Sequence, residues 1–423
     1  MNTRTTLLAT GIAAAMTLAA CGGSDNTADK ATSRGEITIW VTSLPTEQQF
    51  GNAMAEAWNA GHPGEKVNVV KVPSGGSVEE VVVASITAGT TPCLVYNTES
   101  SSVVQYQKMG GVVALDSFAD GASYISARSG SIADQYKSPD GHFYQFPWKE
   151  NPAMLYYNKK IFAAAGLNAD NPPLRTWSEF LQTLRTLKAK GGVQAAVWPP
   201  PGNQWYNAWF DFYAFYIADA GKRLVEDGKA QFTDPTGLGI ANLWKTIYAE
   251  GLASKEKYGG TEPFADGKSA VAIWGNDVLP TFTKQNVDFG IVPMPTQSGK
   301  PATQVSSFAN EKSIGMFTSC AHQATAWDFL KFTTSQESDE KLLDITRQLP
   351  VRQNLATTYA TFFGQHPELR PFAQQADRTM GVPLVANGVD MWTKFRKAWT
   401  DAVIFGQKPV EQAFTEAADA IEN

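Results

Sequence analysis

Four consecutive residues, Trp148, Lys149, Glu150 and Asn151, place an aromatic ring beside polar groups in the segment FPWKEN. A tryptophan ring can stack on the weakly apolar C–H face of a sugar, and carboxylate and amide groups can bind sugar hydroxyls. We therefore expect Trp148, Glu150 and Asn151 to contact a carbohydrate, although Trp148 could instead pack a hinge. We expect Lys149 to be a solvated charge.

This segment is followed closely by the start of a new folding unit. Thr176 and Glu179 have the spacing of a capping box, in which each side chain binds the other residue's free backbone N–H. Apolar residues then recur at helical spacing, at Trp177, Phe180, Leu181, Leu184 and Leu187. Sugar-compatible side chains at the junction of two units predict two lobes with a ligand cleft between them.

The elements that position the first lobe alternate between strands and helices. Strands are expected at residues 37–41, 67–72 and 93–96, and helices are expected after the capping-box pairs Thr46–Gln49 and Ser77–Glu80. This alternation predicts βαβ units and a parallel sheet. Because ligands bind at the carboxyl ends of such strands, Trp40 and Glu99 are further candidates. Trp40 could instead belong to the core, and Glu99 could serve a helix N-terminus through its dipole.

A second group of candidates lies further along the chain. Trp205 and Trp274 are expected to stack on the ligand, and Gly275 would let the backbone approach it closely. Asn276 and Asp277 follow and are expected to bind hydroxyls, although Asp277 could instead serve the short helix after it. Three other aromatic residues recur at helical spacing and are expected in the core: Trp209, Phe212 and Tyr213.

The first residues are expected to be a sorting signal rather than part of the fold. Arg4 precedes an apolar stretch at residues 7–18 that is too short to span a bilayer comfortably. The stretch ends in Leu-Ala-Ala-Cys at Cys21, which resembles the lipobox of bacterial lipoproteins. The resemblance implies a signal peptide at residues 1–20, lipid on Cys21 and a flexible tether at residues 21–35. The alternative is an ordinary secretory signal.

Composition argues against several other classes. The 423-residue chain has a formal net charge of −6, and removing the signal, which holds one arginine and no acid, leaves −7. This charge argues against nucleic acid or an anionic lipid surface as the partner. Cys93 and Cys320 could form one disulfide in an exported protein or stay as two buried thiols, and we favour the thiols. No metal-like spacing is present, so no metal or other cofactor is expected.

Five segments together carry a more specific signal. In order, they are LAAC, FPWKENPAMLYYNKKIFAAAGL with TWSEF, FADGKSAVAIWG, VDFGIVPMP and LPVRQN. They resemble the extracellular solute-binding proteins of ABC importers, specifically the oligosaccharide-binding group that includes maltose-binding protein. The resemblance covers nearly the whole mature chain.

This resemblance implies an α/β fold of the two-lobed periplasmic-binding-protein type (type II). Each lobe is expected to hold a mainly parallel sheet flanked by helices. Three crossings between lobes are implied, near residues 150–152, near residues 292–295 and between residues 334 and 350. The implied N-terminal lobe comprises residues 36–150 and 293–340, and the implied C-terminal lobe comprises residues 151–292 and 341–423.

The resemblance also implies two further cleft positions. Arg352, in LPVRQN, resembles a family position that faces the cleft, although it could instead be a structural ion-pair partner. After VPMP the family commonly has a Gly-Gly that lines the cleft. This chain has Ser306-Ser307-Phe308 at about that place, so Ser307 becomes the candidate there.

The function implied is that of a substrate-binding lipoprotein, not an enzyme, which captures an oligosaccharide and delivers it to the permease subunits of an ABC transporter. The protein would be exported, monomeric and held at the outer face of the cell membrane by the lipid alone. A binder of a phosphorylated polyol such as glycerol phosphate is the alternative ligand class and would want a cationic cleft or a helix N-terminus. An exported glycoside hydrolase with two paired acids is the alternative of a different class.

Overall fold

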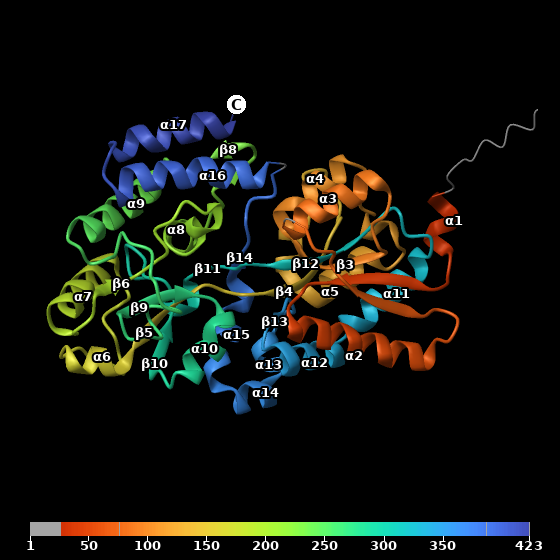
Figure 1. Cartoon of the computed structure of the whole chain (residues 1–423), viewed down its shortest axis with the longest axis horizontal. Helices are drawn as coiled ribbons and strands as arrows, with labels where there is room; N and C mark the ends of the chain where they lie inside the picture. Colours follow the sequence, from red (N-terminus) through yellow and green to blue (C-terminus); the bar gives the residue numbers. More distant parts are fainter. Residues whose placement is uncertain (1–26, 76, 386, 423) are drawn as a thin grey trace, which may run out of the picture.

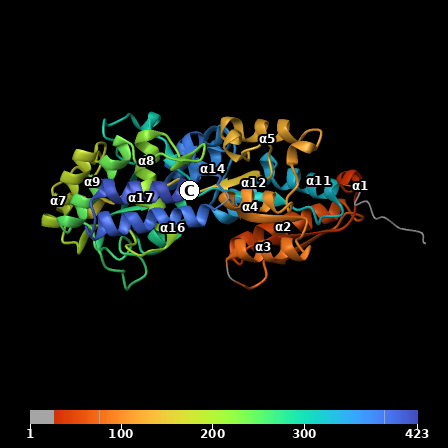
Figure 2. The same ribbon diagram turned by 90° about the horizontal axis from the view of Figure 1, so that it is seen from above.

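The computed structural model describes residues 27–75, 77–385 and 387–422. Within these ranges the chain forms two α/β bodies that lie side by side along the long axis of the molecule (Figure 1). One body is built on a six-stranded sheet and the other on a four-stranded sheet. We call them the first half and the second half; Figure 2 shows them from above.

The sheet of the first half has the strand order β13-β4-β12-β3-β1-β2. Its strands are β1 (Ile37–Val41), β2 (Val67–Lys71), β3 (Leu94–Glu99), β4 (Phe146–Glu150), β12 (Lys312–Met316) and β13 (Leu349–Pro350). β1 is parallel to β2 and β3, but β12 is antiparallel to β3 and β4, and β13 is antiparallel to β4. The prediction of a mainly parallel sheet is wrong here, because strands from distant parts of the chain enter the sheet in opposite directions.

Helices cover both faces of this sheet. They are α2 (Pro45–Gly61), α3 (Val78–Ala88), α4 (Ser100–Lys108), α5 (Gly121–Ser129), α11 (Gln323–Thr333) and α12 (Gln336–Thr346). Successive residues of β1 point to opposite faces. Ile39 packs in the cluster that contains Phe50 of α2, whereas Trp40 packs in the cluster that contains Val82 of α3. Both clusters are buried, so Trp40 is a core residue of this half.

The sheet of the second half has the strand order β10-β5-β9-β6. Its strands are β5 (Met154–Asn158), β6 (Ala195–Val197), β9 (Ser269–Trp274) and β10 (Phe289–Val292). β6 is parallel to β9, but β5 is antiparallel to both β9 and β10, so this sheet is not mainly parallel either. β5 enters directly from β4 of the first half and therefore runs against its neighbours.

One face of this second sheet is covered by a large helical layer. Its helices are α6 (Lys159–Ala164), α7 (Trp177–Lys190), α8 (Phe212–Ala220), α9 (Pro235–Ala249), α16 (Gly388–Trp399) and α17 (Val410–Glu422). The predicted capping box of Thr176 and Glu179 is present at the start of α7. The core positions predicted from helical spacing are also buried in this layer: Trp209, Phe212 and Tyr213.

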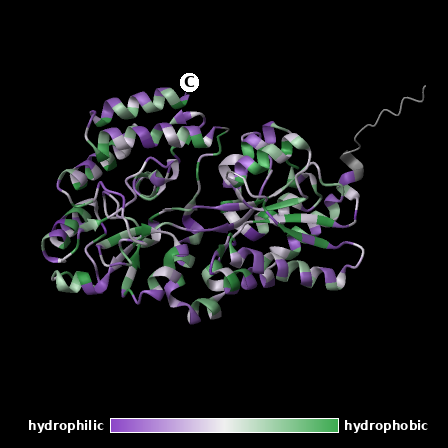
Figure 3. Cartoon of the chain, viewed as in Figure 1, coloured by the Kyte–Doolittle hydropathy of each residue, from purple (hydrophilic) through white to green (hydrophobic). Residues whose placement is uncertain are grey.

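Hydrophobic and hydrophilic residues alternate along the outer helices, as Figure 3 shows for α16 and α17. Such alternation gives a helix one face for the core and one for water. Among the described residues, no helix is both long enough and apolar enough to cross a membrane.

The other face of the second sheet joins the two halves. It is covered by α10 (Leu279–Lys284), α13 (Leu355–Thr358), α14 (Ala360–Gln365) and α15 (Arg370–Gln375). Tyr156 of β5 lies in one buried cluster with Leu343 of α12 and Leu349 of β13, which belong to the first half. The C-terminal part of the chain thus packs against both bodies.

The chain passes between the sheets in neighbouring segments. Residues 151–153 connect β4 to β5, and residues 293–311 connect β10 to β12. The two connections touch, since the backbone N–H of Ala153 donates to the carbonyl of Phe308 at 2.7 Å. The second connection contains β11 (Ser307–Phe308), which pairs with β14 (Thr379–Met380) on the way to α16.

The last part of the predicted tether is folded onto the first half. Residues 1–26, including Cys21, lie outside the described residues, but α1 (Thr27–Thr32) is helical. Ser33 hydrogen-bonds the ring of His322 at 2.9 Å, and Arg34 forms an ion pair with Asp328 at 2.5 Å. The prediction of a flexible tether through residue 35 is therefore corrected, because its last residues pack against the first half near α11.

Of the two capping boxes predicted in the first half, one is present and one is not. The capping box of Ser77 and Glu80 is present at the start of α3, as predicted. The one predicted for Thr46 and Gln49 is absent, because α2 begins at Pro45, two residues before the start that a Thr46 cap would give, and a proline fits the first helical turn.

A disulfide joins Cys93 and Cys320, which corrects the preference for two free thiols. Cys93 directly precedes β3, and Cys320 follows β12, the antiparallel neighbour of β3. The pairing of these strands brings together two cysteines that are 227 residues apart in the sequence. The sequence contained no local signal for this proximity.

Replacing both cysteines with alanine should lower the free energy of unfolding by about 2–4 kcal/mol, because the disulfide restricts the unfolded chain across a long loop. Urea unfolding of the double variant, compared with the parent protein before and after reduction, measures the loss. Reduction should move the parent midpoint to that of the variant and leave the variant unchanged. Equal midpoints for oxidised parent and variant would show that this bond contributes nothing.

Candidate functional site

An aromatic cavity of about 540 Å³ lies in the second half. Five rings line it, from the loop after β6, the turn before α8, the loop before β9 and the end of β9: Trp198, Tyr206, Phe210, Tyr258 and Trp274. In the sheet register Trp274 lies opposite Met154, the first residue of β5. The cavity therefore lies at the end of the sheet where the chain arrives from the first half. We call it the aromatic cavity.

Several rings of the aromatic cavity are held in place by contacts behind them. Phe210 and Trp274 lie with ring centroids 5.0 Å apart, and Trp198 meets Tyr258 edge-on at 5.1 Å. The indole N–H of Trp198 donates to the carbonyl of Glu256 at 2.8 Å. Fixed aromatic faces of this kind are suited to the C–H faces of sugar rings.

Polar groups are built into the same wall. Glu262 accepts hydrogen bonds from the indole N–H of Trp274 at 3.2 Å and from the backbone N–H of Ala265 at 2.7 Å. Burial raises the pKa of the Glu262 carboxyl, and these bonds oppose the rise. Glu262 thus fixes the Trp274 ring while its carboxylate lines the cavity.

The loop on the opposite side of the aromatic cavity is held by a buried arginine. Arg396 of α16 donates to the carbonyl of Pro200 at 2.8 Å and to the carbonyl of Gly202 at 2.9 Å. Its charge is paired with Asp211 at 2.7 Å, and both side chains are fully buried. The two members of this pair are 185 residues apart, so no local pattern in the sequence predicts their contact.

Three of the predicted site residues are brought together where the chain crosses from β4 to β5. Asn151 donates from its amide to Asp277 at 2.8 Å and accepts from the backbone N–H of Asn276 at 2.6 Å. The amide of Asn276 donates to the carbonyl of Arg347 at 2.7 Å. A Cβ on Gly275 would lie 1.9 Å from the Asn151 side-chain oxygen, so Asn151, rather than a ligand, makes glycine necessary here.

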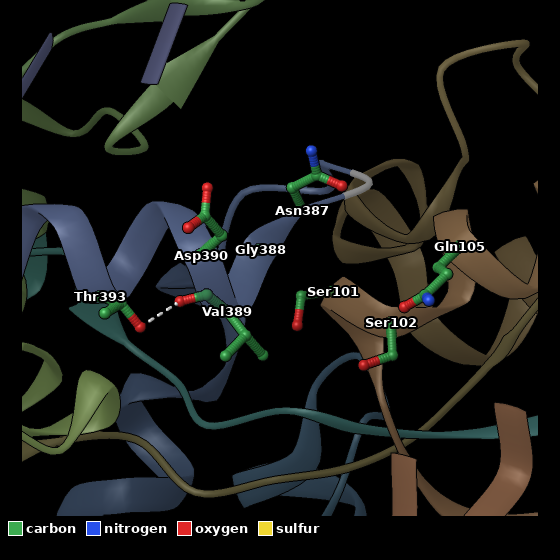
Figure 4. A pocket seen from close by; sticks show the side chains of 8 residues that line it. All are labelled: Ser101, Ser102, Gln105, Asn387, Gly388, Val389, Asp390 and Thr393. Carbon is green, nitrogen blue, oxygen red and sulfur yellow. Dashed lines mark hydrogen bonds between the residues drawn. The ribbon is translucent and has the colours of Figure 1, made fainter. Parts of the chain in front are cut away.

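A second cavity, of about 600 Å³, lies between the halves (Figure 4). We call it the interhalf cavity. α4 contributes Ser101, Ser102 and Gln105, and the start of α16 contributes residues 387–390 with Thr393. Ser101 lies opposite Gly388, whose added Cβ would come within 3.2 Å of the serine Cβ. Hydroxyl and amide groups from both halves therefore face one space, as polyhydroxylated ligands require.

A protein-family model described as bacterial extracellular solute-binding protein matches residues 53–371, about three quarters of the chain. The chain belongs to this family. The family resemblance inferred from the sequence is thereby confirmed. Members of the family are transport receptors rather than enzymes, which confirms the expectation that this solute-binding protein has no catalytic role. They act outside the cytoplasm, so the expectation of an exported protein is confirmed at that level.

The relatives that the chain resembles are named for different ligands. The chain is 25% identical to the diacetylchitobiose binding protein DasA of Streptomyces coelicolor, over 97% of this chain and 96% of that protein. It is 22% identical to the sn-glycerol-3-phosphate-binding periplasmic protein UgpB of Agrobacterium fabrum, over 75% of this chain and 74% of that protein. The crystal structure of the cyclic alpha-maltosyl-1,6-maltose binding protein from Arthrobacter globiformis superposes with a TM-score of 0.80. That match has 22% identity and covers 92% of this chain and 98% of the other, so the α/β fold is shared.

The remaining predicted tryptophans are placed differently in the solute-binding protein. Trp148 is 1% exposed and packs against Phe50 and Tyr96 in the core of the first half. Trp40 is enclosed by the cluster under α3. Trp205 is half-buried, and its ring meets Tyr206 and Trp209 edge-on. Trp40 and Trp148 therefore offer no free ring face to a ligand in this structure.

Two lysine–glutamate pairs lie at the edge of the first sheet that faces the second half. Lys149 pairs with Glu47, which also accepts from Thr42, and both charges are buried. The expectation that Lys149 is solvated is wrong. Burial lowers its pKa, whereas Glu47 and the charge of Asp277 across the crossing raise it.

The second pair joins Glu99 to Lys312. Burial raises the pKa of the Glu99 carboxyl, and the lysine opposes the rise. Glu99 makes no side-chain capping bond at α4 and keeps one buried oxygen without a hydrogen-bond partner. Glu99 is the N-cap residue of α4, and Ser101 and Ser102, which follow it, line the interhalf cavity.

Three predicted residues make contacts inside the protein. Glu150 accepts a hydrogen bond from Thr379 at 2.7 Å. Ser307 is fully buried, with its hydroxyl 3.7 Å from the sulfur of Met154. Arg352 pairs with Asp339 at 2.8 Å, which is the structural alternative considered for it. Within the described ranges, no group of three or more His, Cys, Asp or Glu side chains has a metal-binding arrangement.

Proposed function

We propose that this solute-binding protein captures an oligosaccharide between its two halves and delivers it to an ABC permease. The aromatic cavity carries the proposal, because five rings at the end of the second sheet offer stacking faces that a sugar chain can use. The interhalf cavity adds hydroxyl and amide partners from both halves. Two relatives, named as binders of diacetylchitobiose and of cyclic alpha-maltosyl-1,6-maltose, point to the same ligand class.

The proposed ligand set combines predicted residues with residues that the sequence analysis missed. Trp274, Asn151 and Asp277 form the hinge side of the site. The further members are Tyr206, Phe210, Tyr258, Ser101 and Ser102. The missed residues lie in loops or at a helix start, where periodicity gives no signal.

Capture is proposed to involve closing of the two halves about their connections, the usual motion of such receptors. The hinge would comprise residues 151–153, residues 293–311 and the chain after β13. The lobe division at residue 340 would then shift, because β13 at Leu349–Pro350 pairs with β4 of the first half.

We further propose that lipid on Cys21 anchors the protein to the outer face of the cell membrane. The described structure begins with α1 at Thr27, so residues 22–26 separate it from Cys21. α1 itself packs near α11 of the first half. Five extended residues reach at most about 18 Å. The anchor would therefore hold the end of the first half near the bilayer. Metabolic labelling with a fatty acid, compared between the parent and Cys21→Ala, tests this, and equal labelling would contradict it.

A phosphorylated polyol is the second ligand class, favoured by the names of the glycerol-phosphate relatives. Lys257 lines the aromatic cavity and could meet a phosphate. Arg352 is not available, because it binds Asp339 and the carbonyl of Thr334. The aromatic lining and the engaged arginine favour a neutral sugar.

Isothermal titration of the purified protein with maltooligosaccharides, chitooligosaccharides and glycerol 3-phosphate separates these classes. We expect stoichiometric binding of an oligosaccharide, which is recovered unchanged. Shorter products would indicate a hydrolase. Binding of glycerol 3-phosphate alone would overturn the sugar assignment.

Trp274→Ala should weaken sugar binding by about thirtyfold, the loss of roughly 2 kcal/mol typical of a buried aromatic anchor. Titration with the sugar that binds the parent protein measures the loss. Phe405→Ala is the matched control, because Phe405 is an exposed aromatic residue of the same half outside both cavities. Unchanged affinity for Trp274→Ala would remove the aromatic cavity from the proposed site.

A further inference from the structure

Residues 379–381, which we call the bridging segment, are bonded to both halves. On the first half, the side chain of Gln135 donates to the carbonyl of Thr379 at 2.8 Å and accepts from the backbone N–H of Gly381 at 3.3 Å. On the second half, the hydroxyl of Tyr213 in α8 donates to the carbonyl of Gly381 at 2.9 Å. The bridging segment therefore lies in the contact between the halves.

Two carboxyl groups, one in the last residue of β4 and one in the last residue of the connection from β10 to β12, are buried against the bridging segment. Glu150, at the end of β4, accepts from the Thr379 hydroxyl at 2.7 Å. Glu311, just before β12, lies so close to Gly381 that an added Cβ there would come 1.9 Å from its Oε1. Each glutamate is 3% exposed. Oε1 of Glu311 is buried with no hydrogen-bond partner among the described residues.

The charges around this pair do not neutralise both acids. The titratable and charged groups that act on them are Tyr136, Arg223, Lys312, Glu99 and Asp377. Arg223 and Lys312 favour the charged form of Glu311, but Glu99 opposes it. The negative charges of Glu311 and Asp377 both disfavour the charged form of the Glu150 carboxyl. Two like charges in one buried contact favour protonation of at least one of them.

We propose that the two halves close with uptake of protons by Glu311 and Glu150, so that solute capture is promoted at lower pH. The inference rests on the proposed closing motion but not on the identity of the solute. Opening would separate the first half from the bridging segment and return water to the two carboxyl groups. Hydrated carboxyl groups would release the protons that the closed form holds.

The direction of the effect follows from the acidities. Burial raises the pKa of Glu311 to about 7 and that of Glu150 to about 8 in this structure, from an ordinary value of 4.5, and we take its contacts between the halves as those of the closed form. An acid with a raised pKa binds more protons in the closed form, so closing is favoured as pH falls below these values. For Glu311 alone, the closed-to-open ratio should rise about tenfold between pH 8.5 and pH 6.

The distance between spin labels on the two halves tests this without any sugar. Lys108→Cys on α4 and Lys229→Cys on β8 (Lys229–Ala230) place labels at exposed positions of opposite halves. The chain also carries Cys21→Ala, so that the two introduced cysteines are the only free thiols, because Cys93 and Cys320 stay in their disulfide. We expect the short-distance population to gain over the long one, between pH 8.5 and pH 6, by at least the factor of about ten calculated for Glu311 alone. The same distribution at both pH values would overturn the proposal.

Two variants assign the effect to the carboxyl pair. Glu311→Gln mimics the protonated acid and should keep the short distance populated at pH 8.5, with a smaller pH response. Asp219→Asn is the matched control, because Asp219 is also partly buried with a raised pKa but lies at the end of α8 within the second half. It should retain the parent response. A parent-like response in Glu311→Gln would overturn the assignment, whether or not the protein binds a sugar.

Discussion

Trp148→Ala should lower the free energy of unfolding by about 3–5 kcal/mol, the cost typical of removing a large aromatic side chain from a core. The indole is 1% exposed, with ring centroids 5.2 Å from Tyr96 and 6.2 Å from Phe50. Lys149 places its ammonium group 4.5 Å from the indole centre. The cavity left by alanine would lie between β4, β3 and α2, so these elements would lose a shared packing surface.

Urea unfolding followed by circular dichroism measures this loss. Trp148→Phe should cost less, because it keeps a ring in the same core, and Phe405→Ala should change stability little, because its ring is exposed. An unchanged unfolding midpoint for Trp148→Ala, together with lost sugar binding, would show instead that the ring serves the ligand.

Asp339→Ala should also cost about 3–5 kcal/mol, because it leaves two arginine charges without their carboxylate. Asp339 of α12 pairs with Arg128 at 2.8 Å and with Arg352 at 2.8 Å, and its side chain is fully buried. Arg128 also donates to the carbonyls of Pro147, at 2.6 Å, and Val351, at 2.8 Å. The acid thus holds the arginine that ties β4 to the chain after β13.

Thermal and urea unfolding of Asp339→Ala measure this effect. Asp344→Ala is the matched control on the same helix. Asp344 is exposed, and its carboxylate forms a surface ion pair with Arg347 at 3.7 Å. Such pairs contribute at most about 1 kcal/mol. Similar small losses for the two variants would show that the buried acid does not hold the arginines in place.

Interactions between near neighbours in the chain could be read directly from the sequence. The capping boxes at Ser77–Glu80 and Thr176–Glu179 are present, because both partners lie within one helical turn. The strand at Ile37–Val41 and the buried faces at Phe212 and Tyr213 also follow from local patterns. The family resemblance added the α/β fold and the class of receptor.

The position of Trp148 could not be derived in this way. All five residues of β4 are buried, because helices cover both faces of the first sheet. A strand that is covered on both sides loses the alternation that separates inward from outward residues. A tryptophan within such a strand therefore looks the same in the sequence whether it faces a ligand or the core.

The sequence by itself determined the local elements and the solute-binding family, and it singled out Asn151 and Asp277, which the structure brings together. Only the tertiary structure decided which distant groups meet: Glu47 with Lys149, Cys93 with Cys320, and the rings of the aromatic cavity. The physical reason is chain separation. Hydrogen bonds within a turn are set by a few backbone angles, whereas contacts across a hundred residues depend on how the sheets order their strands and where the connections cross.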